Sequence, residues 1–135
     1  KAPGNVTVTG VLEDRDFQAA FIAADLCFLP YLKASQSGIV NWAVRYNLPI
    51  LASQIDYFEE LESNNEFIRT IDLEKDSIPK SISYLFQNKS ILEDMRKSAK
   101  EYYKKNNMSE IAKEHRYIYE NVNGKKSSKQ TEKRI

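Results

Sequence analysis

The stretch CFLPYLKASQSGIVNWAVRYNLPILAS, residues 27–53, decides the fold of this chain. It begins with the apolar run 27–31 and ends with the apolar run 50–52, each long enough for a short buried strand. Between the runs, apolar side chains recur at the spacing of one helix face, at Ile39, Trp42, Ala43 and Tyr46. Asn47-Leu48-Pro49 ends this helix. Two buried strands joined by a helix predict a parallel pair with a right-handed crossover.

The loop Ser35-Gln36-Ser37-Gly38 lies where the first strand of this unit leads into its helix. The first backbone N–H groups of a helix have no partner within the helix and carry the positive end of its dipole. Such a position binds phosphate or another anion well, and a glycine allows close approach. The residues alone support two interpretations, an anion site and a merely capped helix.

The segments on either side extend the same alternation of strands and helices. Upstream, the β-rich run 5–9 predicts a strand that ends at Gly10, and residues 13–25 predict an amphipathic helix with an acidic first turn. Downstream we expect a short helix from about residue 56, a strand at 67–71 near a sheet edge, and helices opened by Ser77, Ser90 and Ser109. This order predicts an α/β doubly wound domain with a helical C-terminal flank.

Length and composition are those of one ordinary globular domain. The chain has 135 residues, of which 41% are hydrophobic and 29% charged. No apolar run approaches the ~20 residues of a membrane span, and Lys1-Ala2-Pro3-Gly4 is unlike a secretory signal. The single cysteine, Cys27, excludes a disulfide or a cysteine metal site within one chain and fits a reducing cytoplasm. Its apolar surroundings favour a buried structural thiol over a reactive one.

The net charge of +1 divides unevenly along the chain. Residues 123–135 hold five basic residues and one acidic residue, a net charge of +4, whereas residues 1–122 hold 15 basic and 18 acidic, a net charge of −3. A mildly acidic body argues against a nucleic-acid-binding domain, which carries its basic patch on the fold. The basic tail lacks apolar periodicity, so we expect it to be disordered, either as a solubilising tail or in contact with anionic lipid.

Catalytic and metal-binding signatures are sparse. The only histidine, His115, has apolar neighbours at helical spacing and is expected to pack or to lie on the surface. We find no Ser-His-Asp or Cys-His arrangement, no cluster at metal-ligand spacing, no Gly-x-Gly-x-x-Gly and no Walker loop. The residues therefore support neither a metal site nor a dinucleotide site.

Three glutamates and two tyrosines are expected near the carboxyl edge of the strands, where ligands of parallel sheets bind. Glu59, Glu60 and Glu62 form either a solvated helix face or a group with one functional carboxylate, and we favour Glu60 for that role because it follows the strand ending at Ser53. The aromatic rings of Tyr31 and Tyr57 either stack on a ligand or close the core.

The order of these motifs resembles the C-terminal, donor-binding domain of the GT-B glycosyltransferases, in particular the group 1 (family 4) retaining enzymes. The resemblance covers about residues 5–122, so that the predicted domain is 1–122, part of a GT-B C-terminal domain, and 123–135 is the tail. The matching segments are Val6-Thr7-Val8-Thr9-Gly10, Asp25-Leu26-Cys27-Phe28-Leu29-Pro30, Gln36-Ser37-Gly38-Ile39-Val40-Asn41-Trp42-Ala43, Leu48-Pro49-Ile50-Leu51-Ala52-Ser53, Glu60-Leu61 and Ile118-Tyr119-Glu120-Asn121-Val122. The fold that it implies is a Rossmann-like three-layer parallel sheet of about four strands.

The resemblance implies a function in the full-length protein. That function is transfer of a sugar, with retained anomeric configuration, from a nucleotide-diphosphate sugar to a glycan or lipid-linked acceptor, with no metal and no other cofactor. Its implied donor-binding residues are Ser35, Gln36, Ser37, Gly38, Ile39 and Val40, acting largely through backbone N–H groups, and Glu60 near the nucleotide. An N-terminal domain outside this chain would bind the acceptor. The implied setting is polysaccharide biosynthesis in the cytoplasm, with peripheral contact at the inner face of the membrane and no nucleic-acid partner.

The chain departs from the family pattern in two ways. The family's E-x7-E pair is absent, because Ser35 and Ala43 stand at its two positions, and Asn47 replaces a glycine at the predicted left-handed helix end. Two βα units that precede residue 6 in the family, with a basic Arg/Lys pair, also lie outside the chain. Their strands would separate the run 5–9 from the strand at 27–31. We therefore expect re-paired strands, a strand-swapped dimer or a partner segment, and negligible transferase activity from this chain alone.

Two other classes remain open from the sequence. One is a non-catalytic, flavodoxin-like interaction or regulatory domain, although no acidic pair of the receiver type follows the first predicted strand. The other is a sugar-nucleotide epimerase-like module, which requires a histidine or carboxylate constellation that the residues do not show.

Overall fold

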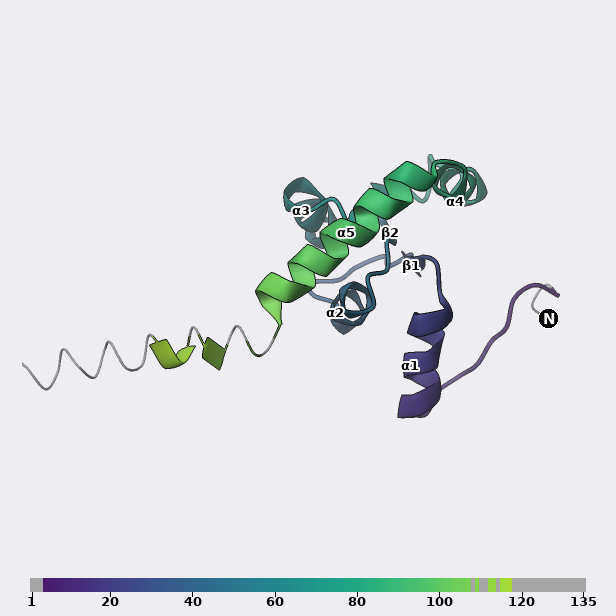
Figure 1. Ribbon diagram of the computed structural model, residues 1–135. Coiled ribbons are helices and arrows are strands. Elements are labelled where there is room, and N and C mark those ends of the chain that lie inside the picture. The colour runs from purple at the N-terminus through teal and green to yellow at the C-terminus, as the bar shows by residue number, and fades with distance from the viewer. Residues whose placement is uncertain (1–3, 108, 110–111, 114, 118–135) are drawn as a thin grey trace, which may run out of the picture. The chain divides into compact units, whose positions relative to one another are not determined.

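The computed structural model describes residues 4–107, 109, 112–113 and 115–117 (Figure 1). Its elements are, in chain order, α1 (Asp14–Ala23), β1 (Cys27–Leu29), α2 (Gly38–Arg45), β2 (Ile50–Ser53), α3 (Asp56–Asn64), β3 (Ile68–Ile71), α4 (Ile78–Gln87) and α5 (Lys89–Asn106). The chain divides into two compact units between Lys100 and Glu101, and the fold and sites described below lie in the first. The predicted tail 123–135, and much of the helix expected from Ser109, lie outside the described residues.

The three strands form one parallel sheet in the order β1-β2-β3. Phe28 pairs with Leu51, and Leu51 pairs with Arg69, so the carboxyl ends of the three strands meet at one edge. The parallel pairing predicted from residues 27–53 is confirmed, as is the position of the last strand at an edge of the sheet. The chain is therefore an α/β protein with a parallel sheet.

The strand predicted at residues 5–9 is wrong. These residues form no strand, and Val6 and Val8 are 51% and 81% exposed. The described part of the chain therefore has a sheet of three strands, where about four were expected. A β-rich sequence becomes a strand only when a neighbouring strand accepts and donates its backbone hydrogen bonds. No described segment pairs its backbone with this run, so its propensity alone does not order it as a strand.

Helix α2 buries a slightly different face from the one predicted. Val40, Ala43 and Val44 are its buried residues, whereas Trp42 is only half-buried. The ring of Trp42 instead packs edge-on against Phe17 of α1, with the centroids 5.2 Å apart. The predicted apolar face is thus divided, since Ala43 is buried in the core whereas Trp42 contacts α1. The side chains that make these two contacts lie on adjacent faces of the helix.

The end of α2 confirms the predicted left-handed residue. Asn47 has φ 57°. The Leu48 N–H donates to the Ala43 carbonyl at 2.9 Å, and the Asn47 N–H donates to the Val44 carbonyl at 3.1 Å. This is the Schellman arrangement, in which the residue just past the helix adopts the left-handed conformation. It turns the chain directly into β2.

Replacing Asn47 by alanine should lower the free energy of unfolding by about 1 kcal/mol, because a β-carbon without a compensating polar group is strained at this φ. Asn47→Gly should change it by less than about 0.5 kcal/mol, since glycine adopts this conformation without strain. Urea unfolding of both variants measures the difference. Equal stability of the alanine and glycine variants would contradict the assignment.

Helices α4 and α5 pack on one face of the sheet (Figure 1). Leu51 and Ile71 of the sheet share a buried cluster with Leu85 of α4 and with Leu92 and Met95 of α5. Ser77 caps α4 as predicted, since its hydroxyl accepts from the Lys80 N–H at 3.4 Å. Ser90 does not cap α5, because the helix already begins at Lys89 and the Asn88 carbonyl accepts its first hydrogen bonds.

Candidate functional site

A polar cleft of about 490 Å³ lies at the carboxyl edge of the sheet. Its lining comes from the carboxyl end of the sheet and from the segments that follow the three strands, including α3. The lining residues are Tyr31, Leu32, Ser53, Gln54, Ile55, Glu59, Asp72, Leu73, Glu74 and Lys75. In a parallel sheet, ligands bind at this edge because the loops that leave the strands converge there. We call it the carboxyl-edge cleft.

Ser53 fixes the direction of the chain as it leaves β1. Its side chain is 2% exposed, and its hydroxyl donates to the carbonyl of Tyr31 and, at 3.4 Å, to that of Leu29. The ring of Tyr31 lies 5.7 Å from that of the buried Phe58 in α3. Tyr31 therefore packs against the core and also lines the cleft, and its predicted stacking on a ligand stays a prediction.

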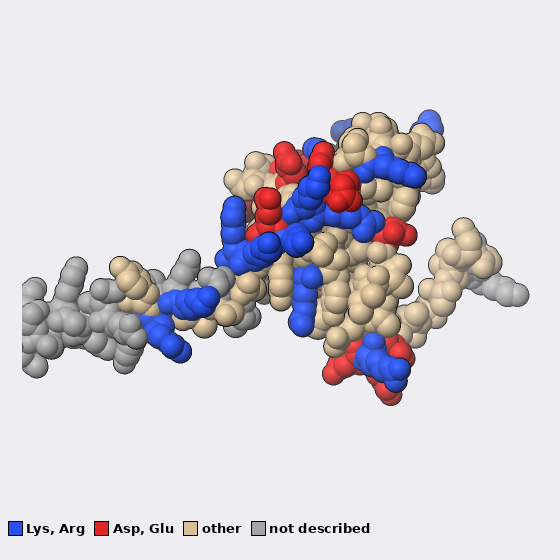
Figure 2. Space-filling model, in the orientation of Figure 1, with Lys and Arg blue, Asp and Glu red and all other residues tan. Residues whose placement is uncertain are grey.

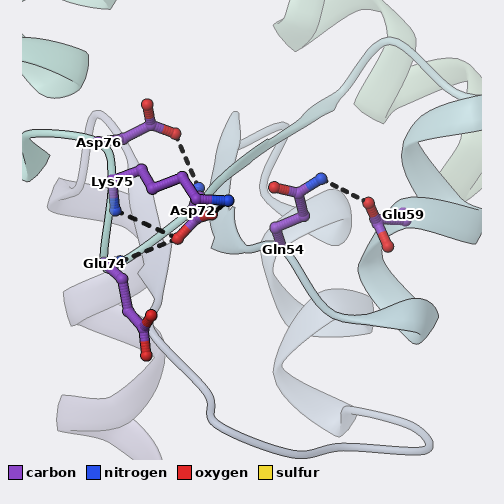
Figure 3. A network of polar contacts seen from close by, with 6 residues as sticks. All are labelled: Gln54, Glu59, Asp72, Glu74, Lys75 and Asp76. Carbon is purple, nitrogen blue, oxygen red and sulfur yellow. Dashed lines mark hydrogen bonds and ion pairs between the residues drawn. The ribbon is translucent and has the colours of Figure 1, made fainter.

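The turn after β3 forms the other wall and is held by Asp72 (Figure 3). Its carboxylate accepts from the N–H groups of Glu74 at 2.9 Å and Lys75 at 3.2 Å, and pairs with the Lys75 ammonium at 3.1 Å. In return, the carboxylate of Asp76 accepts from the Asp72 N–H at 2.8 Å. These bonds make the turn a rigid wall of the cleft.

The hydrogen bond from the Glu74 N–H, and then the Lys75 side chain, hold the pKa of the Asp72 carboxyl below its ordinary value of 3.8. Because the pKa of Asp72 is lower in the folded state, its charged carboxylate stabilises the fold. This stabilisation is fully present above pH 3.8 and is lost as the pH falls through the folded-state pKa. We expect an NMR titration of the Asp72 side-chain carboxyl to give a midpoint below 3.8. A midpoint at or above that value would contradict the described turn.

The three glutamates of α3 have different surroundings. Glu59 lines the cleft and accepts from the Gln54 side-chain amide at 2.7 Å (Figure 3). The carboxylate of Glu62 accepts from the Thr70 hydroxyl and so ties α3 to β3. Glu60, the residue favoured from sequence, is exposed on α3 and is not among the residues that line the cleft. The geometry therefore favours Glu59 as the carboxylate of this cleft.

The loop from Ser35 to Val40 leads from β1 into α2 at the same edge of the sheet. Ser35 and Gln36 are exposed and Ile39 is half-buried. Val40 is 2% exposed and its N–H already donates to the Ser37 carbonyl at 3.3 Å, so it has least to offer a ligand. None of these loop residues lines the carboxyl-edge cleft itself. The predicted donor-binding residues thus form a second, neighbouring group at the helix start.

Ser37 is the unusual residue of this loop. It stands at the N-cap position of α2 with an extended backbone, φ −145° and ψ 117°, yet its side chain makes no capping hydrogen bond. The residue is 9% exposed, and its Oγ is buried without a hydrogen-bond partner in the described structure. Buried hydroxyl groups are nearly always hydrogen-bonded, so an orphaned one requires an explanation. After a rotation about χ1, a ligand at the start of α2 would supply the missing partner.

The start of α2 has open space around Gly38 and no acidic residue in its first turn. A β-carbon added at Gly38 would meet no atom within 4 Å, so neither packing nor backbone conformation requires glycine there. The first turn of α2 has no acidic residue, whereas α1 has Asp14 and Asp16 in its first turn. No acidic residue of the first turn therefore balances the positive end of the α2 dipole.

Other candidate groups offer no chemistry. Burial raises the pKa of the Cys27 thiol to about 11, so that very little thiolate exists at neutral pH. His115 is exposed. In the described part of the chain, no group of three or more histidine, cysteine or acidic side chains lies in a position to hold a metal ion. Nor is any helix of that part long and apolar enough to cross a membrane.

Comparisons with protein-family models, with curated proteins and with solved structures find no match to this chain. The fold and the site define the class, an α/β protein whose parallel sheet carries a polar cleft and an open helix start at its carboxyl edge. Gln54 and the turn at 72–75 also belong to this edge and were not predicted from the sequence. The signal for the turn was present, because an aspartate just after a strand often accepts from N–H groups two or three residues on.

Proposed function

We propose that this chain is the nucleotide-sugar-binding part of a retaining glycosyltransferase, with a Rossmann-like, three-layer domain of the GT-B group 1 type. The motif order along residues 5–122 supports the family, and the parallel order of β1, β2 and β3 is compatible with one half of such a sheet. The full-length protein transfers the sugar to a glycan or lipid-linked acceptor in the cytoplasm. The chain alone binds the donor weakly and transfers no sugar.

The orphaned hydroxyl of Ser37 carries this proposal. A phosphate oxygen in front of α2 accepts from that hydroxyl after a rotation about χ1, and from the N–H groups of Gly38 and Ile39, which have no partner within the helix. Charge-assisted hydrogen bonds of this kind are about twice as strong as neutral ones. The diphosphate of the donor is thus bound chiefly by backbone, as expected for a loop without glutamates.

The carboxyl-edge cleft suits the uncharged part of the donor. Carboxylate and amide oxygens of Glu59 and Gln54 accept from sugar or ribose hydroxyl groups, and the exposed part of Tyr31 offers an apolar surface. Acidic groups on the cleft wall, Glu59 and Glu74 among them, repel a diphosphate. The charges therefore orient the donor, with the diphosphate at α2 and its hydroxyl groups in the cleft.

The same geometry assists the reaction. Sugar transfer breaks the bond between the anomeric carbon and the phosphate oxygen. A new bond forms between that carbon and the oxygen of the acceptor hydroxyl, whose proton passes to the departing phosphate oxygen. Negative charge grows on the departing diphosphate as the first bond breaks. Preorganised N–H groups at Gly38 and Ile39, aided by the helix dipole, stabilise that charge more in the transition state than in the bound donor.

Replacing Ser37 by alanine should raise stability and weaken binding at once. The hydroxyl makes no cap bond to lose, and its removal relieves a buried group without a partner, so the free energy of unfolding should rise by about 1 kcal/mol. Affinity for UDP, GDP and pyrophosphate should fall about tenfold, because one hydrogen bond to a charged group is lost. Urea unfolding and isothermal titration calorimetry measure the two quantities.

The matched control is Ser83→Ala, since Ser83 is exposed on α4, away from the loop. That variant should leave both stability and affinity unchanged. Loss of stability in Ser37→Ala, with affinity intact, would identify Ser37 as an ordinary helix cap and remove the support for the donor site.

The exposed run 5–11 favours a second candidate, a flavodoxin-like interaction domain that pairs strands with a second copy. Val6, Val8 and Val11 are 51%, 81% and 103% exposed, and strand β1 has a neighbour on one side only. A strand-swapped dimer would bury these valines. Sedimentation of the chain tests this pairing, because a dimer disrupted by Val8→Lys supports it and a monomer at all concentrations excludes it.

A further inference from the structure

A second cavity, of about 540 Å³, lies between the edge strand β3 and helix α4. Its floor is aliphatic and is formed by Leu51, Ile71, Leu85 and Ile91. Its remaining lining residues are polar or amphipathic, namely Arg69, Lys80, Ser81 and Tyr84. We call it the α4 pocket. It shares no lining residue with the carboxyl-edge cleft, so it is a separate site.

The charge of the α4 pocket is positive and uncompensated. Arg69 and Lys80 are both exposed, and no carboxylate is among the lining residues. Neither Arg69 nor Lys80 takes part in an ion pair of the described residues, unlike Lys75, Arg96 and Lys97. Figure 2 shows Lys and Arg side chains beside a largely uncharged surface over α4, at the upper right of the view. Two cations placed together without an acid favour the binding of an anion.

The aliphatic floor of the α4 pocket favours an anion that carries an apolar group. Ile71 and Leu85 are 8% and 4% exposed and belong to the core cluster, so the floor is rigid. Tyr84 is 57% exposed at the edge of the pocket, with its ring available to cover an apolar group. Pockets of roughly 300–1,000 Å³ with an apolar lining and few polar groups are typical of sites for small molecules.

We propose that the α4 pocket binds a single-chain anionic amphiphile, an aliphatic chain that ends in a carboxylate or a phosphate. The guanidinium of Arg69 forms two parallel hydrogen bonds to such a head group, a geometry that lysine does not offer. Lys80 adds a second charge and Ser81 a hydroxyl donor. The chain lies on the four aliphatic residues of the floor, under Tyr84.

The test uses the whole chain with dodecanoate and dodecyl phosphate as ligands, below the concentrations at which they form micelles. Backbone amide shifts should move at Arg69, Ser81 and Tyr84. The uncharged dodecan-1-ol and the short butanoate should each bind at least about tenfold more weakly than dodecanoate, because each lacks one half of the recognised group. The tighter of the two long anions identifies the preferred head group.

Two kinds of variant connect the binding to the pocket. Arg69→Gln and Lys80→Gln should each weaken dodecanoate binding about tenfold, whereas Lys89→Gln, an exposed lysine outside the pocket, should not. Ser81→Trp fills the pocket from the middle of α4 and should abolish binding while the melting temperature is retained. This variant keeps the test valid even if a charge substitution perturbs the fold.

Two results would overturn the proposal. One is equal affinity for dodecanoate and dodecan-1-ol, unchanged in Arg69→Gln, since the cations would then have no role. The other is shifts concentrated at exposed apolar residues elsewhere, such as Val8 and Ile22, which are 81% and 69% exposed. That pattern would show general adsorption of an amphiphile to the surface.

Discussion

Gly38→Glu should abolish measurable binding of UDP, GDP and pyrophosphate while it stabilises the fold. A side chain at Gly38, the first residue of α2, has open space around its β-carbon, and a carboxylate there repels a diphosphate bound at the helix start. The same substitution exchanges glycine for a better helix former and gives the dipole its missing counter-charge, so the free energy of unfolding should rise by about 1 kcal/mol. A gain in stability with complete loss of binding is not expected of a residue with a purely structural role.

Gly38→Gln is the matched control for charge. Its side chain has nearly the same size and a similar helix propensity, but no charge. We expect it to weaken diphosphate binding about tenfold by obstruction, and to leave more residual binding than the glutamate variant. Calorimetry at low salt, with pyrophosphate as a ligand that lacks base and sugar, measures both variants. Equal binding by wild type and Gly38→Glu would contradict an anion site at α2.

Phe58→Ala should have the largest effect on stability, a loss of about 3–5 kcal/mol. The Phe58 side chain is 0% exposed, and its ring lies 5.7 Å from that of Tyr31 and 5.1 Å from that of Tyr57. Since whole domains have about 5–15 kcal/mol of stability, the melting temperature should fall by more than about 10 °C. The variant also removes the support of Tyr31, so the carboxyl-edge cleft should lose its order before the domain unfolds.

Phe86→Ala provides the comparison, because Phe86 is 43% exposed on α4. The ring of Phe86 contributes less buried apolar surface than the ring of Phe58. Its removal should therefore lower the free energy of unfolding by only about 1 kcal/mol. Thermal unfolding followed by circular dichroism separates the two variants. Similar losses at Phe58 and Phe86 would mean that the packing under α3 does not stabilise the cleft.

The central strand–helix–strand unit was predictable because independent signals agreed within residues 27–53. Apolar runs, helical spacing and a stop at Asn47 all indicated the same elements. The left-handed conformation of Asn47 followed from the resemblance, in which Asn47 replaces a glycine. The run 5–9 gave an equally good local signal and failed. A strand requires a partner, and sequence analysis of one segment does not show whether that partner is present.

The site was predictable only in part, for a similar reason. The loop at Ser37 followed from its position between a strand and a helix, but the orphaned state of its hydroxyl depends on packing around it. The choice between Glu59 and Glu60 depends on the rotation of α3, which a short helix with three close glutamates does not reveal. Glu59 is distinguished from Glu60 by one hydrogen bond, which the side-chain amide of Gln54 donates to the Glu59 carboxylate at 2.7 Å.

The most direct test is a titration of the wild-type chain with UDP and GDP sugars, followed through backbone amide shifts in NMR spectra. We predict that the amides of Ser37, Gly38 and Ile39 shift together, with dissociation constants on the order of millimolar, as expected of half of a donor site. Residues of the α4 pocket, such as Ser81 and Tyr84, should not move. Unmoved amides at Ser37, Gly38 and Ile39 with millimolar ligand would contradict the proposed donor site.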